Sequence, residues 1–179
     1  MYPTAVIDEH YSVGRGTKIW HFTHVMKDSI LGENCNLGRN AVISPGGKLG
    51  KNVKVHNNVS IYTGVTWEDD VFRGPYYMLT NITNPRRAVA RRGDYARTTE
   101  KKGSSIGANA TIVCGLDIGC LVFVGAGAVV TINIPDDALV IGNPARHVGW
   151  MSEYGQRLRF NEEGQTQCRE SGEKYTLHN

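Results

Sequence analysis

The feature that most constrains this chain is an aliphatic side chain at every sixth position. From Ile7 to Leu79 this register continues without a break except at Trp67 and Arg73. Neither the period of a helix nor the two-residue alternation of a strand produces a strict period of six. Such a period is typical of a solenoid in which each hexad forms a short strand and a corner, and three hexads close one triangular coil. Stacked coils bury a continuous core that no single coil buries alone.

The same register returns after one interruption. It is carried in this second block by the residues Ile106, Ile112, Ile118, Val124 and Val130. The fifth position of most hexads is small or β-branched, which suits a cramped corner interior. We therefore predict an all-β chain in which two blocks of parallel β-helix flank a single excursion at residues 80–105.

The end of the chain differs in kind from the repeat. We expect residues 1–150 to form the hexapeptide-repeat domain and residues 151–179 to form a C-terminal tail. In this tail, Ser152 to Arg159 is predicted to be a short helix, and Cys168 to Leu177 reads as a hairpin around Ser171 and Gly172. A single cysteine cannot build a zinc knuckle, so we assign the tail no chemistry.

Composition and charge limit which cellular compartment and which classes of partner we expect. No apolar stretch reaches the roughly 18 residues of a membrane span, and the N-terminus lacks a basic-then-apolar signal, so we expect a cytoplasmic protein. The four cysteines contain no C-x-x-C pair, and Cys35 falls at an interior corner position, which favours reduced packing residues. A net charge of +3 is too small to indicate a nucleic-acid partner.

The excursion is strongly basic. It carries a positive excess of five charges, from the residues Arg86, Arg87, Arg91, Arg92, Arg97, Lys101 and Lys102 against Asp94 and Glu100. Long loops inside compact domains are usually functional, and arginine suits bidentate contacts to phosphate or carboxylate. The excursion is therefore either a lid over an anionic ligand or a solvated surface loop.

Several motifs outside the hexads are more specific. They are Ile19-Trp-His-Phe-Thr-His24, Val55-His-Asn-Asn-Val-Ser-Ile-Tyr62, Glu68-Asp-Asp-Val-Phe72, Thr80-Asn81, Asn84-Pro-Arg86, Ile106 to Gly115 and Ala138 to Met151. With them the chain resembles the hexapeptide-repeat acetyltransferases that N-acetylate the 3-amino group of UDP-linked 2-acetamido-3-amino-2,3-dideoxyglucuronic acid in bacterial surface-polysaccharide (lipopolysaccharide) synthesis. The resemblance implies a left-handed β-helix, acetyl-CoA as co-substrate, a nucleotide-sugar acceptor, and a homotrimer with active sites between subunits. No metal, nucleic-acid partner or membrane span is implied.

The resemblance also indicates catalytic residues. It places Asn81 beside the sugar amine, where its amide would orient the nucleophile while the coenzyme sulfur takes the proton. As a plain loop residue, Asn81 would instead cap backbone groups. His24, His21 and His56 are the alternative bases, because histidine titrates near neutrality, although each would equally stack against Trp20 or bond a backbone carbonyl. Residues three apart point differently in a β-helix, so His21 and His24 are not expected to share a task.

Binding residues follow from the same motifs. The acceptor is expected to contact His21, Asn57, Asn58, Asn84 and Arg86, although both Asn57 and Asn58 would equally serve as corner residues. For acetyl-CoA, Gly107, Gly125 and Ala126 would let pantetheine approach the backbone, and Arg146 would face a phosphate. As plain structure, these glycines are turn residues of the repeat and Arg146 is an exposed cation.

Some positions depart from the family pattern. Trp67 and Arg73 stand where relatives have smaller or aliphatic core residues, Tyr76 and Tyr77 where small residues are expected, and Cys120-Leu121 in place of an Arg-Tyr pair. A buried unpaired arginine costs several kcal/mol, so Arg73 must reach a carboxylate or the rim unless the coil bulges.

Three rival functions remain open. A zinc hydratase on this scaffold needs three converging histidines, and the six here contain no pair eighteen residues apart. A non-enzymatic solenoid would need neither the basic excursion nor the Pro144-Ala-Arg146 exit. The third rival keeps acetyl transfer but changes the acceptor to a dTDP-linked amino sugar or a hydroxyl group.

Overall fold

The computed structural model describes residues 1–91 and 93–177, and over these residues it contains strands and no helix. The strands are β1 (Val6–Ile7), β2 (Ser12–Val13), β3 (Lys18–Ile19), β4 (His24–Val25), β5 (Ile30–Leu31), β6 (Asn36–Leu37), β7 (Val42–Ile43), β8 (Lys48–Leu49), β9 (Lys54–Val55), β10 (Ser60–Ile61), β11 (Val65–Trp67), β12 (Phe72–Arg73), β13 (Met78–Leu79), β14 (Thr98–Glu100), β15 (Ser105–Ile106), β16 (Thr111–Ile112), β17 (Asp117–Ile118), β18 (Phe123–Val124), β19 (Val129–Val130), β20 (Ala138–Ile141), β21 (Arg146–Met151), β22 (Arg157–Leu158), β23 (Gln165–Gln167) and β24 (Lys174–Thr176).

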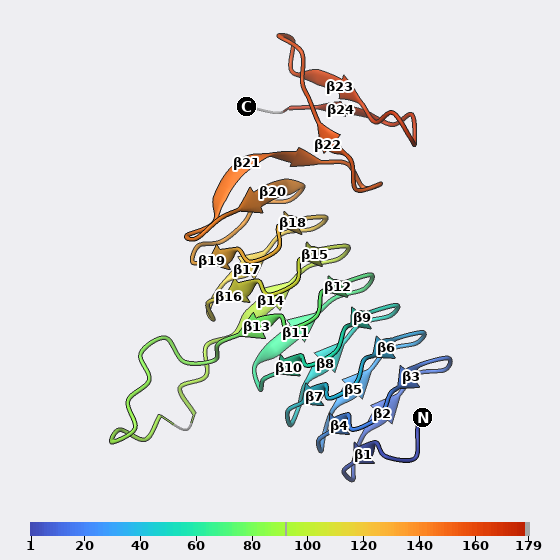
Figure 1. Ribbon diagram of the computed structural model, residues 1–179, viewed down its shortest axis with the longest axis vertical. Coiled ribbons are helices and arrows are strands. Elements are labelled where there is room, and N and C mark those ends of the chain that lie inside the picture. The colour runs from blue at the N-terminus through green and yellow to red at the C-terminus, as the bar shows by residue number, and fades with distance from the viewer. Residues whose placement is uncertain (92, 178–179) are drawn as a thin grey trace.

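Successive strands take turns on three faces of a prism (Figure 1). The first face holds β1, β4, β7 and β10 and continues with β13, β16 and β19. The second face holds β2, β5, β8, β11, β14 and β17. The third face holds β3, β6, β9, β12, β15, β18, β20, β21 and β22. Every pair within the coils is parallel, and partners such as Val6 and His24 or Lys18 and Asn36 lie eighteen residues apart. The predicted all-β architecture is confirmed, and it agrees with the left-handed parallel β-helix that the resemblance implied.

The first position of each hexad forms the core. Ile19, Leu37, Ile61, Ile106 and Val124 are at most 1% exposed, and they stack from coil to coil inside the prism. Fifth-position residues line the corners from within, as predicted. Burial of this continuous aliphatic column is the main stabilising term of the fold, at about 25 cal/mol per Å² of apolar surface.

The excursion is shorter than the sequence predicted. β13 ends at Leu79, and β14 already rejoins the prism at Thr98, paired with Val65 of β11. Residues 80–97, which we call the basic loop, therefore project from the prism while 98–105 belong to the repeat (Figure 1). The predicted boundary at 105 was wrong because Glu100 occupies the hexad position six before Ile106, and its charge hid the register. Arg92, one of the predicted basic residues, lies outside the described residues.

Charged and aromatic side chains replace aliphatic ones where the basic loop leaves the prism. We call Trp67, Arg73, Tyr77 and Glu100 the buried network, because each is at most 1% exposed. Arg73 Nη2 forms an ion pair with Glu100, which is the carboxylate partner that a buried arginine was predicted to need. The Tyr77 hydroxyl donates a hydrogen bond to Glu100 Oε1 at 2.5 Å, and the Arg73 guanidinium lies 4.9 Å from the centre of a Trp67 ring.

Burial shifts the titration of this network. It lowers the pKa of Arg73 to about 9, which leaves the guanidinium charged at pH 7, and it raises the pKa of Tyr77. Tyr77 therefore stays neutral and keeps its proton for Glu100. Removing one partner of such a pair typically costs ~3–5 kcal/mol, because the remaining charge stays buried.

The tail is partly as predicted. β23 and β24 form an antiparallel hairpin around the predicted turn, with Thr166 opposite Tyr175, but its first strand ends at Gln167, before the predicted start at Cys168. The predicted helix from Ser152 to Arg159 was wrong: a turn closed by the Ser152 hydroxyl leads into β22, which pairs antiparallel with β21. Arg157 and Leu158 form a strand because the edge of β21 provides unpaired backbone groups for them to bond, and the side chain of Leu158 is buried.

Two further observations concern the described residues. None of them forms a helix long and apolar enough to cross a bilayer. All four cysteines are free thiols, three of them buried, as the sequence predicted.

Candidate active site

His24 and Asp8 form a hydrogen-bonded pair on the outside of the first face. His24 belongs to β4, and its side chain points outward because Val25, the next residue, fills the core. Its Nε2 lies 2.9 Å from Asp8 Oδ1, and the two side chains are 37% and 35% exposed. A carboxylate on one ring nitrogen fixes the orientation of an imidazole and supports a charged form during proton transfer. The pair can therefore act as a solvent-accessible base.

His21 lies in a different environment from His24. Its Nδ1 contacts the Thr4 hydroxyl at 2.8 Å, and its ring packs at 4.5 Å from Tyr2, which itself stacks on Trp20. His21 and His24 thus face separate partners.

Asn81 is the second residue of the basic loop, after Thr80, which follows β13 directly. Its main-chain carbonyl accepts a hydrogen bond from the N–H of Ala96 at 3.0 Å, which closes the base of the loop. This contact uses only the main chain of Asn81. The hydroxyls of Thr80 and Thr98 accept hydrogen bonds from the N–H groups of Cys114 and Gly115 at 2.9 and 3.0 Å. Both ends of the loop are therefore held on the following coil.

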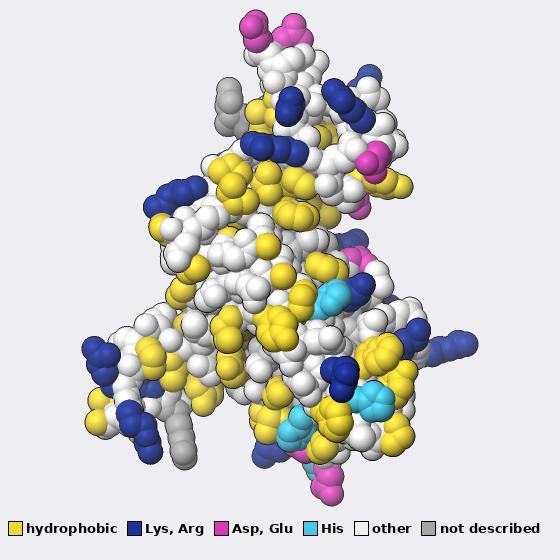
Figure 2. Space-filling model, viewed as in Figure 1, with side chains coloured by type: hydrophobic (Ala, Val, Ile, Leu, Met, Phe, Trp, Pro, Cys, Tyr) yellow, Lys and Arg dark blue, Asp and Glu magenta, His cyan; other side chains and the backbone are white. Residues whose placement is uncertain are grey.

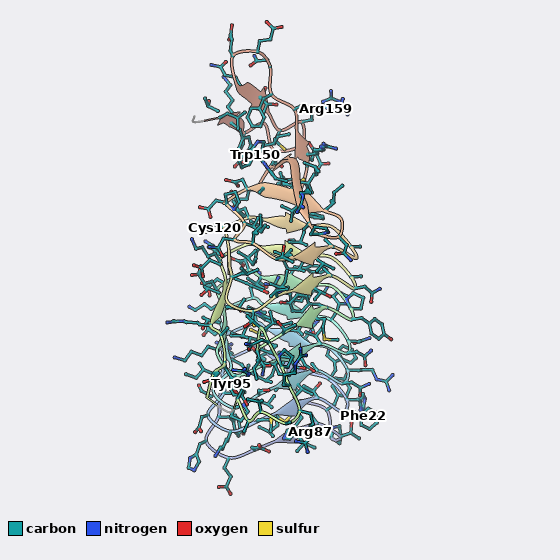
Figure 3. All side chains as sticks on the ribbon, turned by 90° about the vertical axis from the view of Figure 1, so that its left-hand side faces the viewer. Phe22, Arg87, Tyr95, Cys120, Trp150 and Arg159 are labelled. Carbon is teal, nitrogen blue, oxygen red and sulfur yellow. The ribbon has the colours of Figure 1, made fainter. Side chains whose placement is uncertain are left out.

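The basic loop carries Asn84 and Arg86 away from the prism. Both residues are exposed, and the backbone of Arg86 pairs with Val89 in an isolated antiparallel bridge. A hollow of about 260 Å³ in the loop is lined by Ile82, Pro85, Arg86, Arg87, Val89 and Arg91. Basic side chains lie toward the outer end of this projection, among hydrophobic and uncharged ones (Figure 2), and the labelled Arg87 and Tyr95 lie in front of the coils in Figure 3.

Asn57 and Asn58 make corner contacts. Asn57 Oδ1 accepts a hydrogen bond from the N–H of Arg39 at 2.9 Å, and Asn58 Oδ1 accepts one from Asn40 Nδ2 at 3.1 Å. Asn58 also adopts φ of 59°, a left-handed conformation that asparagine tolerates well. These contacts are those expected of corner residues.

A hollow of about 280 Å³ opens beside this corner. Its lining comprises Trp20, Asn36, Gly38, Arg39, Lys54, Val55, His56 and Asn57. Burial, and next to it the positive charge of Lys54, lowers the pKa of His56. Its ring packs edge-on against Phe72 at 5.3 Å. This neutral imidazole lies among two cationic residues and an indole, so the hollow suits an anionic or aromatic group.

The proposed coenzyme residues lie on the same line of corners. A methyl group on Gly107 would lie 2.5 Å from the backbone nitrogen of Ala126, so the stacking of coils itself demands glycine there. Gly125 is partly exposed and Ala126 exposed, which leaves this corner open to a ligand. Arg146 is exposed at the start of β21, where its Nη1 donates a hydrogen bond to the carbonyl of Ala145 at 3.0 Å.

The chain arranges the candidate residues along three lines. The corners that enter the first face hold one set: His21, Asn57, Asn58, Gly107, Gly125 and Ala126. His24 lies on that face, and Asn81 begins the corner that leaves it, with Asn84 and Arg86 farther out on the basic loop. Asp8 was missed from the sequence. A signal existed, since Asp8 directly follows the core residue Ile7 and the strand pairs place His24 beside Val6.

Comparisons with known proteins converge on one family. Residues 10–45 match the family described as Bacterial transferase hexapeptide (six repeats), and residues 29–63 match the Hexapeptide repeat of succinyl-transferase. The dTDP-3-amino-3,6-dideoxy-alpha-D-galactopyranose 3-N-acetyltransferase of Aneurinibacillus thermoaerophilus is 40% identical over 160 residues, which cover 89% of this chain and 82% of that protein.

Other similarities are more distant. The bifunctional protein GlmU of Thermosynechococcus vestitus is 30% identical over 129 residues, and the match spans 72% of this chain but 26% of GlmU. A hexapeptide-repeat acetyltransferase from Vibrio cholerae, solved with acetyl coenzyme A, superposes with a TM-score of 0.59 at 24% identity over 70% of this chain and 72% of that one. The superposition shows a shared β-helical fold.

Proposed function

The chain belongs to the bacterial hexapeptide-repeat transferases, and we propose that it transfers the acetyl group of acetyl-CoA to the 3-amino group of a nucleotide-linked sugar. The observation that carries the proposal is the 40% identity to a 3-N-acetyltransferase over 82% of that protein's length. Two features support it: the His24–Asp8 pair would serve as a base, and the open corner at Ala126 would admit the coenzyme.

The residues of this chain would divide the work as follows. Acetyl-CoA supplies the activated acyl group, and the corner at Gly107, Gly125 and Ala126 would take its pantetheine arm. Backbone N–H groups at such a corner would stabilise the oxyanion. β4 and β13 lie three strands apart on the first face, roughly 14 Å at about 4.8 Å per strand, so His24 and Asn81 would not contact one amine within a subunit. The side-chain amide of Asn81 would orient the sugar amine and the coenzyme sulfur would take its proton; in the alternative, His24, held by Asp8, would be the base.

The acceptor is best sought among 3-amino sugars. The relative from Aneurinibacillus acts on a dTDP-linked sugar by its name, which favours dTDP as the nucleotide. The second candidate is UDP-linked 2-acetamido-3-amino-2,3-dideoxyglucuronic acid, whose carboxylate would suit the arginines of the basic loop. Either product would serve the assembly of bacterial surface polysaccharide such as lipopolysaccharide, from a reaction in the cytoplasm.

We further propose that three copies assemble around a threefold axis. Asn84 and Arg86 project away from the prism that carries His24 and Asn57, so a neighbouring copy is needed to bring them against an acceptor (Figure 1). Closed cyclic symmetry is the common solution for such subunits. Light scattering should give the mass of a trimer. A monomer would leave the acceptor site without the basic loop.

The deciding experiment is a thiol-release assay. Acetyl-CoA is combined with a panel of dTDP- and UDP-linked 3-amino sugars, and matching 3-hydroxy sugars serve as controls. We expect CoA release with a 3-amino acceptor and mass spectrometry showing an added acetyl group on nitrogen. Release with the hydroxy sugars alone would replace N-acetylation with O-acetylation. No release with any acceptor, together with no binding of acetyl-CoA in calorimetry, would favour a non-enzymatic solenoid.

A further inference from the structure

The buried network lies at the base of the basic loop. Tyr77 lies directly before β13, the last strand ahead of the loop, and Glu100 lies in β14, the first strand after it. Trp67 and Arg73 come from β11 and β12, on the second and third faces of the preceding coil. The four side chains therefore connect the two ends of the loop through the interior of the prism.

The contacts within the network are directional. Besides its ion pair with Glu100, Arg73 donates hydrogen bonds from Nη1 to the carbonyl of Phe72 at 2.6 Å and to that of Ser104 at 3.4 Å. The carboxylate of Glu100 also accepts a hydrogen bond from the Tyr77 hydroxyl. Aliphatic residues at these hexad positions would fill the core without any such geometric requirement, as they do in the other coils.

The position of the network matters because the loop interrupts the regular register. Before the loop, stacked residues lie eighteen apart, as Phe72 and Lys54 do, whereas Phe72 pairs with Ser105 on its other side, thirty-three residues later. After such an insertion, burial of aliphatic side chains excludes a one-residue slip of the returning strand, which would turn its inner face outward, but it does not distinguish shifts that keep the same face inward. A carboxylate that is stable only opposite Arg73 and Tyr77 removes that ambiguity.

We propose that the buried network is a positioning device for the basic loop. It places β14 at one register, which sets the Asn81–Ala96 contact at the loop base and, through it, the reach of Asn84 and Arg86 toward the acceptor. The step from loop position to acceptor affinity rests on the proposed acetyltransferase function. The step from network to loop position does not.

The test separates packing from positioning. The triple variant Arg73→Met/Tyr77→Phe/Glu100→Leu gives the interior an apolar core, and replacing a buried ion pair in this way is often neutral or stabilising. We expect its melting temperature to equal or exceed that of the wild type. Hydrogen–deuterium exchange of residues 80–97 should nevertheless accelerate roughly tenfold, because apolar contacts do not distinguish shifts of β14 that keep the same face inward.

Kinetics on the same variant give a second measurement. The KM for the amino-sugar nucleotide should rise roughly tenfold, while the KM for acetyl-CoA should stay within about twofold of the wild type. The single variant Arg73→Met leaves Glu100 without its cation, and it should show the same loop exchange together with a melting temperature lower by roughly 10 °C.

A matched control removes the effect of stability alone. Leu31→Ala creates a cavity in β5, which β8 separates from β11 of the network, and it lowers the melting temperature without touching the loop. Its loop exchange should be that of the wild type. The proposal is overturned if the triple variant exchanges like the wild type, or if Leu31→Ala loosens the loop equally. If the exchange results hold but the wild type acetylates no nucleotide sugar, the proposed function fails while the positioning of the loop stands.

Discussion

His24 and Asp8 meet at 2.9 Å although sixteen residues separate them in the chain. The contact runs diagonally across the first face, from the strand of one coil to the corner of the coil before it. A half-exposed imidazole held by a carboxylate is the arrangement expected of a general base whose ring must stay oriented.

The first prediction follows from this pair. His24→Gln should lower kcat about 100-fold or more, because general-base catalysis typically contributes that much. Asp8→Asn should lower kcat less, since the base remains but loses its orienting charge. Steady-state kinetics with acetyl-CoA and the accepted amino sugar measure both. If His24→Gln keeps the wild-type kcat, the proton goes to the coenzyme sulfur instead.

The second prediction concerns Asn81. Asn81→Ala should lower kcat at least tenfold with a melting temperature within about 2 °C of the wild type, because its contact at the loop base uses only the main chain. Thr83→Ala, an exposed neighbour in the same loop, serves as the control and should match the wild type in both measurements. A loss of stability without a loss of kcat would make Asn81 a structural residue.

The hexad register predicted the prism because its physical cause is local and repeats. Ile19, Leu37 and Ile61 each indicate an interior position by their own side chain and place in the hexad, so no distant residue has to be known. The register failed at Glu100 because a charge there is tolerated only when Arg73 and Tyr77 face it, and that meeting depends on the fold of two coils. The same limitation hid Asp8, whose partner His24 lies one coil away.

The tail was harder to predict than the coils. A polar segment such as Ser152 to Arg159 has no strong preference of its own, and only Arg157 and Leu158 become a strand, where the edge of β21 offers hydrogen bonds. Site residues divide in the same way: the corner contacts of Asn57 and Asn58 repeat with the coil, as the sequence allowed. The direction in which Asn84 and Arg86 project depends on how the basic loop leaves the prism.

The third prediction tests the basic loop. Replacing Arg86 and Arg87 by alanine should raise the KM for the amino-sugar nucleotide roughly tenfold and leave the KM for acetyl-CoA nearly unchanged, since both arginines line the hollow of the loop. Replacing Arg15, an exposed arginine outside the loop, should change neither value. Equal increases in both KM values would argue against an acceptor role for the loop.

The fourth prediction is a pH dependence of stability. Burial and Lys54 lower the pKa of His56 below its unfolded value of 6.5, so below that pH the unfolded chain binds more protons than the folded one. Stability should therefore fall as the pH drops through 6.5 toward the lower, folded pKa of His56. His56→Gln should make the melting temperature less sensitive to pH in this window, and Lys54→Gln should do so partly. A wild-type slope in His56→Gln would assign the effect to other groups.

The fifth prediction compares two glycines of the proposed coenzyme corner. A methyl group on Gly107 would lie 2.5 Å from a backbone nitrogen of Ala126, whereas on Gly125 it would meet the side chain of Ile141 at 2.7 Å. Ile141 is 47% exposed and can move, while the stacked backbone cannot. Gly107→Ala should therefore lower the free energy of unfolding by about 2–3 kcal/mol, and Gly125→Ala by less than about 1 kcal/mol.

Chemical denaturation of the two variants measures this difference directly. Neither glycine has a positive φ, so alanine brings no backbone strain and would by itself stabilise each site by ~0.4–1 kcal/mol through the unfolded state. Any decrease in the unfolding free energy of Gly107→Ala must then come from the clash of the added methyl group with the neighbouring coil. If Gly107→Ala is as stable as the wild type, the coils can separate at this corner. The glycine would then be explained by the approach of the coenzyme, and a raised KM for acetyl-CoA in Gly107→Ala would show it.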